Sequence, residues 1–379
     1  MANDGYAVAK ELRKMNVDVD LAINVSDFGM ALPQWEETEI TNTLDPFSLN
    51  LSDIKDKWNS PSWIRYFDFL NKVPRKKHLL AKINSRINII KMIREYDIVE
   101  THVPWAIYSQ FSGVPYVVYD AGWIRYFPYG KGLRDKLARR GYNKARKVII
   151  TNPDTFEIAD KLPYLNKDQT VFVPFAIDPD KYKISDETNL RNQYSNGNEF
   201  LIFCPARQIW NEKGNDKMIR AFTKFQKLIP NSKFIMVAWS LDEHKSKELV
   251  NSLGVSDKII WIKPVPKNQL IKYYNAVDVV LDQFTLGSWG TSTPEAMSCG
   301  KPVIMYYKEN FILRAFGEKP PILNSFHEDE ICSNLLILAK DPDLKKEIGY
   351  ESREWVKRTH GPRVVAQKHL EILQNAIKN

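Results

Sequence analysis

The feature of this sequence that most constrains its fold is the alternation of short apolar runs with segments of helical periodicity. From Glu199 onward the apolar runs are "EFLIFC", "KFIMVAW", "KIIWI", "DVVLDQF" and "PVIMYY". Between them lie helical stretches such as "NDKMIRAFTKFQKLI", in which apolar residues recur on one side. Continuous apolar strands that alternate with helices are typical of a parallel sheet covered on both faces.

The first half of the chain repeats this pattern. Its strands are predicted at "VDVDLAIN", "DIVET", "PYVVY", "KVIIT" and "TVFVP", each after a helical stretch, and the polar stretch "FAIDPDKYKISDETNLRNQYSNGN" separates the halves. Because 379 residues exceed what one core usually supports, we predict two α/β domains over residues 1–190 and 191–359. A last helix at about 360–379 is predicted to pack back on the first domain. Ligands of such sheets bind at the carboxyl ends of strands, so a cleft between the halves is expected.

The chain opens on "NDGYAVAKELR", which has the character of a turn and helix that follow a strand. Either that strand lies outside this sequence, or the N-terminal sheet is one strand short. The opening residues lack the pattern of a signal peptide, no apolar run approaches the ~18–20 residues needed to cross a bilayer, and three cysteines make no disulfide framework. We therefore expect a cytoplasmic protein.

A formal charge of +8 and a pI near 9.0 suggest an anionic partner, which is nucleic acid, anionic lipid or a phosphorylated substrate. Lysine and arginine residues are dense in "YGKGLRDKLARRGYNKARK", residues 129–147. This stretch is either a solvated helix face or a surface that meets an anion. We expect peripheral contact with an anionic membrane surface through it.

Two segments carry the candidate chemistry. In "CPARQIWNEKG" a strand ends at Cys204 and Arg207 and Lys213 follow, on a loop that feeds a helix near Asp216. Two cations at the carboxyl end of a strand suit a diphosphate, although both also fit as ordinary loop cations.

The second segment, "GSWGTSTPEAMSCGKPVI", begins with a glycine-rich loop whose backbone N–H groups suit phosphate oxygens. Glu295 would repel an anion, but a carboxylate accepts hydrogen bonds well from the two vicinal hydroxyls of a ribose. The alternative is that an acid in a first helical turn needs no ligand. The predicted donor-binding residues are Glu295, Gly287, Trp289, Gly290, Thr291 and Ser292.

These two segments together resemble the donor-binding half of the family-4 retaining glycosyltransferases of the GT-B fold, which has two Rossmann-like parallel-sheet domains facing across a cleft. The resemblance implies that Arg207 and Lys213 bind the donor diphosphate and that Glu295, as the second Glu of the E-x7-E motif, binds the ribose. In the first half, "DIVETH" resembles the D-V-V-H-x-H strand end and makes His102 its last histidine. "GYAVAKELRK" resembles the acceptor loop, which places Gly5 on the acceptor side.

Two departures from the family pattern bear on function. The first Glu of E-x7-E, which contacts the transferred sugar in the family, falls on Gly287, so the identity of the sugar is open. The catalytic-region histidine of the family aligns with Ala121, which leaves Asp120 as the ionisable group beside it. Asp120 either contacts the sugar or acceptor, or caps "GWIRYF".

The resemblance implies transfer of a sugar from a nucleotide diphosphate to a hydroxyl of a glycan or lipid-linked acceptor, with retention of configuration. Arg207, Lys213, Asp120 and His102 are the catalytic candidates, and neither a metal nor a cofactor is expected. One competing interpretation is a sugar-nucleotide-binding protein without transferase activity. Another, a nucleic-acid-binding protein, rests on the pI alone, and we expect no nucleic-acid partner.

Overall fold

The computed structural model describes residues 4–24, 32–37, 58–67 and 78–378, and the chain divides into two compact units. Within the described residues, unit 1 consists of the chain up to Ala176 together with 362–378, and unit 2 consists of residues 177–361. The predicted division at residue 190 therefore lies inside unit 2. Tyr182, for example, is buried in the core of that unit.

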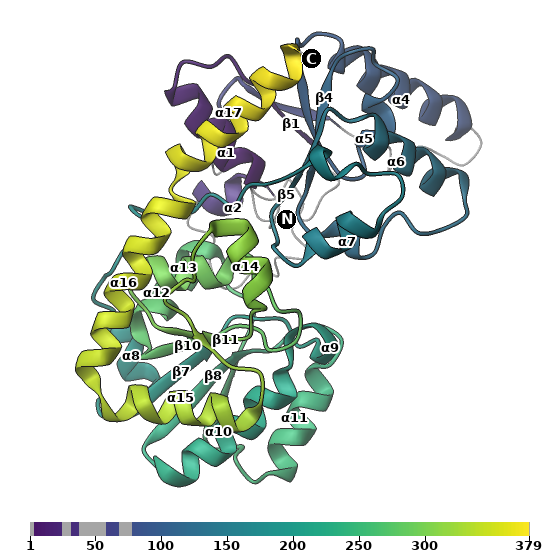
Figure 1. Ribbon diagram of the computed structural model, residues 1–379. Coiled ribbons are helices and arrows are strands. Elements are labelled where there is room, and N and C mark those ends of the chain that lie inside the picture. The colour runs from purple at the N-terminus through teal and green to yellow at the C-terminus, as the bar shows by residue number, and fades with distance from the viewer. Residues whose placement is uncertain (1–3, 25–31, 38–57, 68–77, 379) are drawn as a thin grey trace. The chain divides into compact units, whose positions relative to one another are not determined.

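Unit 2 is built on a six-stranded parallel sheet with the order β12-β11-β10-β7-β8-β9 (Figure 1). Its strands are β7 (Phe200–Cys204), β8 (Ser232–Val237), β9 (Ile259–Ile262), β10 (Val279–Leu281), β11 (Val303–Met305) and β12 (Leu323–Asn324). Its helices are α8 (Thr188–Tyr194), α9 (Trp210–Lys213), α10 (Asn215–Leu228), α11 (Glu243–Ser252), α12 (Lys267–Ala276), α13 (Ser292–Ser298), α14 (Glu309–Phe316), α15 (Glu328–Lys340) and α16 (Pro342–His360).

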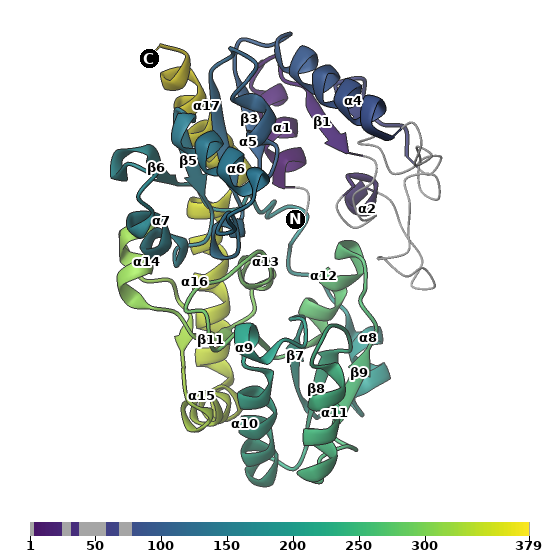
Figure 2. The same ribbon diagram turned by 90° about the vertical axis from the view of Figure 1, so that its right-hand side faces the viewer.

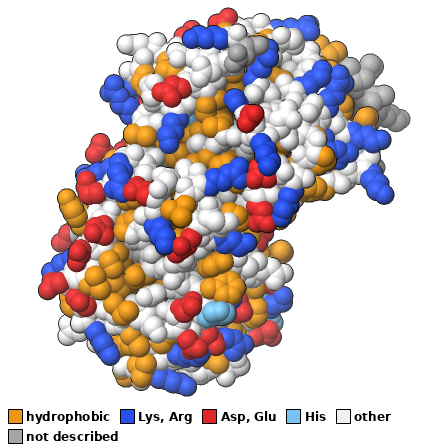
Figure 3. Space-filling model, in the orientation of Figure 1, with side chains coloured by type: hydrophobic (Ala, Val, Ile, Leu, Met, Phe, Trp, Pro, Cys, Tyr) orange, Lys and Arg blue, Asp and Glu red, His pale blue; other side chains and the backbone are white. Residues whose placement is uncertain are grey.

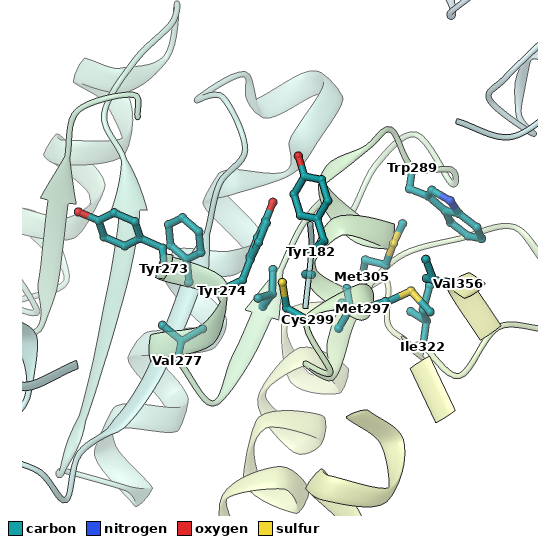
Figure 4. Close-up of a cluster of buried hydrophobic side chains, with 14 of the residues drawn as sticks. Tyr182, Tyr273, Tyr274, Val277, Trp289, Met297, Cys299, Met305, Ile322 and Val356 are labelled. Carbon is teal, nitrogen blue, oxygen red and sulfur yellow. The ribbon is translucent and has the colours of Figure 1, made fainter. Parts of the chain in front are cut away.

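Alternate residues of β7 pack into different cores. Leu201 and Phe203 belong to one buried cluster, part of which is drawn in Figure 4, whereas Phe200, Ile202 and Cys204 belong to another. Side chains alternate across a strand, so the two clusters lie on opposite faces of the sheet. This arrangement confirms the parallel sheet buried on both faces.

The strand order of unit 2 reverses at one point. From β7 the chain proceeds outward through β8 and β9, and from β10 it proceeds in the other direction through β11 and β12. Strands β7 and β10 are hydrogen-bonded neighbours, with Val280 paired to Phe203. The topological switch point of the sheet therefore lies between these two strands, and their carboxyl ends are where such sheets bind ligands.

Unit 1 contains a four-stranded parallel sheet, β3-β4-β5-β6, and a parallel pair, β1-β2. Its strands are β1 (Leu21–Asn24), β2 (Ile64–Phe67), β3 (Val99–His102), β4 (Tyr116–Asp120), β5 (Lys147–Ile150) and β6 (Thr170–Phe172). Its helices are α1 (Asp4–Lys14), α2 (Gln34–Glu37), α4 (His78–Ile93), α5 (Ala106–Ser109), α6 (Leu133–Lys144), α7 (Thr155–Lys161) and α17 (Pro362–Lys378), with short 3-10 helices at Trp123–Arg125 and Lys167–Gln169.

The last helix of the chain belongs to the core of unit 1. α17 packs beside α1 (Figures 1 and 2), and Val365 and Ala366 of α17 are buried with Val8 and Leu12 of α1. Tyr119 of β4 lies in the same cluster. Residues from the two ends of the sequence thus meet over one sheet.

The charges of the surface are mixed in sign. On the face drawn in Figure 3, Lys and Arg side chains lie interspersed with Asp and Glu side chains. Within the described ranges, none of the helices combines the length and the apolar character that crossing a membrane requires.

Candidate functional site

The candidate site of unit 2 is formed by two loops that contact each other at the switch point. One loop runs from β7 through α9 to α10 and carries Arg207 and Lys213, and the other connects β10 to α13. The backbone N–H of Phe284 donates to the carbonyl oxygen of Lys213 at 2.9 Å. The predicted diphosphate cations and the predicted glycine-rich loop are therefore brought together.

The loop after β7 is fixed from within. The Asn215 amide accepts from the N–H of Ile209 at 3.0 Å and donates to the carbonyl oxygen of Arg207 at 3.2 Å. Gly214 has a φ of +66°, which favours glycine, and a Cβ there would lie 3.1 Å from Thr285 Oγ1, so a larger residue would also crowd the second loop. Arg207 itself is part-exposed and pairs with Glu212 at 3.1 Å.

The loop after β10 is organised by Gln283, a residue that the sequence analysis did not identify. Its side chain is fully buried, donates to the carbonyl oxygens of Tyr306 and Ser288, and accepts from the N–H groups of Thr285 and Leu286. The sequence did contain a signal for this role of Gln283. A polar residue that follows an apolar strand needs hydrogen-bond partners if it is buried.

The backbone of the glycine-rich loop is uncovered at Gly290, because a Cβ built on this residue meets no atom of the described residues within 4 Å. Thr291 and Ser292 follow at the start of α13 and are part-exposed. Gly287 has a φ of +77°, and a Cβ there would lie 2.8 Å from the Cγ of Lys308. A lysine stem therefore covers the position where the family has its first Glu.

Trp289 requires a correction. The predicted donor contact is only 3% exposed, and its ring packs in the core against Phe316, Tyr307 and Trp355 at centroid distances of 5.7, 6.2 and 6.1 Å. Figure 4 draws its indole as one of a cluster of buried side chains that includes Met305 and Val356. Trp289 anchors the loop to the core, and the backbone on either side of it is what the loop can offer to a ligand.

Glu295 lies in the first turn of α13 and is 1% exposed. Its Oε1 accepts from Lys267 Nζ at 2.8 Å and from the Tyr182 hydroxyl at 3.3 Å, and its Oε2 accepts from the Tyr274 hydroxyl at 3.2 Å. The Tyr182 and Tyr274 hydroxyls point the same way in Figure 4. The carboxylate is thus charge-compensated and oriented, by three residues that the sequence analysis did not identify.

In unit 1, Asp120 is a buried cap rather than an open catalytic group. It is fully buried, accepts from the N–H groups of Gly122 at 2.7 Å and Ile124 at 3.2 Å, and accepts from the Tyr142 hydroxyl. Burial raises the pKa of Asp120, although these hydrogen bonds and Arg125 act in the opposite direction. Of the two roles left open for Asp120, these contacts favour the cap.

His102 lies at the carboxyl end of β3 with 44% of its side chain exposed. Its ring stacks on Tyr119 at a centroid distance of 4.4 Å. Gly5, predicted to lie in a loop, lies in the first turn of α1, and a Cβ there would be 3.4 Å from His102 Nε2, so Gly5 and the predicted histidine are adjacent. Desolvation by the packed surroundings lowers the pKa of His102 below its usual value, which favours the neutral imidazole at pH 7.

Solved structures with the same architecture define the class of fold. A glycosyltransferase from Rickettsia africae aligns over all of this chain and 95% of its own, with a TM-score of 0.70 and 16% identity. Anabaena HepE, solved in complex with UDP and glucose, aligns over 82% of this chain and 86% of its own, with a TM-score of 0.67 and 19% identity. The chain has the GT-B fold.

The sequence of unit 2 is similar to one family of known proteins. Residues 186–355 match the family described as glycosyl transferases group 1, and the matched residues lie within unit 2. The alpha-monoglucosyldiacylglycerol synthase of Acholeplasma laidlawii is 26% identical over 216 residues, which are 55% of this chain. That alignment spans 54% of the relative, about half of its length.

Proposed function

We propose that this protein is a retaining glycosyltransferase that moves a sugar from a nucleotide-diphosphate sugar to a hydroxyl of a glycan or lipid-linked acceptor. The proposal rests on the residues that lie at the topological switch point of unit 2. Arg207 and Lys213 follow β7, an open backbone at Gly290 follows β10, and Glu295 lies behind it. This combination suits a diphosphate next to a ribose.

The proposed chemistry needs no protein nucleophile. The bond between the anomeric carbon and the diphosphate oxygen breaks, a bond to the acceptor oxygen forms on the same face, and the acceptor proton passes to the departing diphosphate. Arg207 and Lys213 neutralise the charge that grows on that leaving group, and loss of one such contact typically costs about 3–4 kcal/mol in the transition state. With these cations in place we propose that the reaction requires neither a metal ion nor a cofactor.

The first test is thermal unfolding of the full chain with UDP, GDP, dTDP, ADP and CMP and their sugar conjugates. A ligand at about 100 times its Kd adds about 2.7 kcal/mol of stability. We expect one base to raise the Tm, and Arg207→Ala and Lys213→Ala to abolish that rise. Arg220→Ala and Lys227→Ala, which remove exposed cations of α10, are the matched controls. If no nucleotide raises the Tm, the donor site is refuted.

Transfer is tested separately from binding. With the donor identified, we expect Arg207→Ala and Lys213→Ala each to reduce turnover by about 100-fold or more, and wild-type turnover to survive EDTA. A competing proposal, a sugar-nucleotide-binding protein without transferase activity, is favoured by the closed position of Asp120. A stable bound donor that is neither transferred nor hydrolysed would support that competitor.

On the acceptor side we propose that unit 1 meets an anionic membrane surface. Trp123, Tyr126 and Leu133 are 46%, 62% and 73% exposed, and Lys131 and Arg134 are exposed among them. Exposed aromatic and apolar side chains beside cations suit the interface of an anionic bilayer. One relative is a synthase of a glycolipid, which favours a lipid acceptor.

Sedimentation with phosphatidylcholine vesicles, with and without phosphatidylglycerol, tests the membrane proposal. We expect binding only to the anionic vesicles, with a loss at high salt because surface charges are then screened. Lys131→Glu with Arg134→Glu should abolish binding, whereas Lys346→Glu with Lys357→Glu in unit 2 should leave it intact. Equal binding of both double variants would refute the assigned surface.

A further inference from the structure

One carboxylate of unit 1 lies between two histidines that come from opposite ends of the sequence. Glu100 Oε2 is 2.7 Å from Nδ1 of His369, which belongs to the C-terminal helix α17. Glu100 Oε1 is 3.9 Å from Nε2 of His102. Glu100 and His102 are two residues apart on β3, so their side chains leave the strand on the same side.

The two histidines differ in burial. His369 is 1% exposed and its Nε2 is buried without a hydrogen-bond partner among the described residues, whereas His102 is 44% exposed. Both rings lie against the ring of Tyr119, His102 at a centroid distance of 4.4 Å and His369 at 5.8 Å. His369 is therefore placed to hold Glu100, and His102 is the member of the group that a ligand can reach.

We propose that Glu100 is a positioning residue for His102, that His369 holds Glu100 in this role, and that α17 thereby forms part of the acceptor-side site. The proposal rests on the proposed function, because it takes His102, a catalytic candidate that lies beside Gly5 of the predicted acceptor side, to contact the acceptor. It adds a residue from the last helix to a site otherwise built from α1 and the end of β3.

The charges around the group support this assignment. Burial acts to raise the pKa of Glu100, but the interactions with His369 and His102 together leave the pKa lowered, so Glu100 is a carboxylate at neutral pH. Among the described residues, the other ionisable groups that face His102 include Asp4 of α1, Tyr119 of β4 and His369 of α17. Glu100 and Asp4 both favour the imidazolium, and desolvation opposes it.

The decisive variant is Glu100→Gln, which keeps the shape of the side chain and removes its charge. The carboxylate favours the imidazolium, so its removal should lower the pKa of His102. We would follow the Hε1 signals of the six histidines by NMR titration of the full chain and assign His102 with His102→Gln. Glu157→Gln, which neutralises an exposed acid of α7, is the matched control.

The kinetic readout follows from the sign of this shift. If neutral His102 contacts the acceptor, the acid limb of the kcat/KM profile for the acceptor should move to lower pH in Glu100→Gln, while the KM for the donor stays unchanged. Glu100→Asp retains the charge and should restore part of the wild-type profile. A merely structural role would lower the whole profile without moving its acid limb.

The outcomes separate this inference from the proposed function. An unchanged pKa of His102 in Glu100→Gln overturns the inference, whatever the activity. A shifted pKa in a protein that transfers no sugar supports the pairing and counts against the function. Should Glu100→Gln fail to fold, Glu100→Asp replaces it, since the shorter side chain moves the carboxylate. A smaller change of the His102 pKa is then expected, and none overturns the inference.

Discussion

The contact between Lys267 and Glu295 gives the sharpest quantitative prediction for the donor unit. Glu295 is 1% exposed and Lys267 is 15% exposed, and their charged atoms are 2.8 Å apart. The substitution Lys267→Met removes the ammonium group and keeps most of the volume of the side chain. A carboxylate without its cation then remains buried in the core.

The expected cost follows from burial. Breaking a buried ion pair by removing one partner costs about 3–5 kcal/mol. The hydroxyls of Tyr182 and Tyr274 still donate to the carboxylate, and Lys267 keeps some contact with water, so we expect about 2–3 kcal/mol. For a unit of this size the Tm should fall by about 5–10 °C. Nucleotide binding should weaken too, because Lys267 no longer orients the Glu295 carboxylate that is proposed to meet the ribose.

A double-mutant cycle separates the pair from its surroundings. Urea unfolding of the full chain is measured for wild type, Lys267→Met, Glu295→Gln and the double variant. Glu295→Gln removes the charge from the buried site, so the double variant should be more stable than Lys267→Met alone. A loss below about 0.5 kcal/mol in Lys267→Met, as is usual for a surface substitution, would refute the reasoning.

Three further predictions concern the stability of the two units. Asp278 lies 2.6 Å from Lys345. Burial acts to raise the pKa of Asp278, but Lys345, Arg191 and the N–H of Leu201 together lower it. The resulting stabilisation is present above the unfolded pKa and is lost as pH falls through the folded pKa, so the difference in unfolding free energy between wild type and Asp278→Asn should be about 1–3 kcal/mol at pH 7 and shrink in acid. Asp120→Ala should cost about 1–3 kcal/mol because two buried N–H groups lose their acceptor, whereas Asp120→Asn, which keeps an acceptor oxygen, should cost less in the same urea titration. Gly349→Ala places a Cβ against the carbonyl oxygen of Gly300, so a loss of about 1–3 kcal/mol should appear on thermal unfolding, and an unchanged Tm would contradict the close approach of α16 to the end of α13.

The fold could be predicted from the sequence because strands and helices alternate regularly along the chain. Apolar runs buried on both faces alternate with helices, and this pattern fixes a parallel sheet before any contact is known. The start of unit 2 was placed less well, at residue 191 rather than 177. The polar linker holds Tyr182, which is 4% exposed, and a buried aromatic within a polar stretch leaves no periodic signal.

The sequence predicted only those site residues whose side chains suit a ligand and which also follow the end of a strand. Arg207, Lys213 and Glu295 each lie in a loop or first turn after a strand, and the sheet order brings them to one edge. The partners of the functional groups come from elsewhere: Lys267 lies 28 residues from Glu295, and His369 lies 269 residues from Glu100.

No local pattern reports such pairs, because a buried carboxylate selects its cation through space and any helix that packs nearby can supply one. The same physics explains why Trp289 was assigned to a ligand and why the role of Asp120 stayed open. A tryptophan in a glycine-rich loop and an acid at a strand end are equally compatible with the core and with a site, and only their contacts in the structure separate the two. What the sequence does fix is where to look. Each functional group at the end of a strand needs a partner that holds it in position. Those partners come from distant parts of the sequence, so they cannot be predicted from the motifs that contain the functional groups.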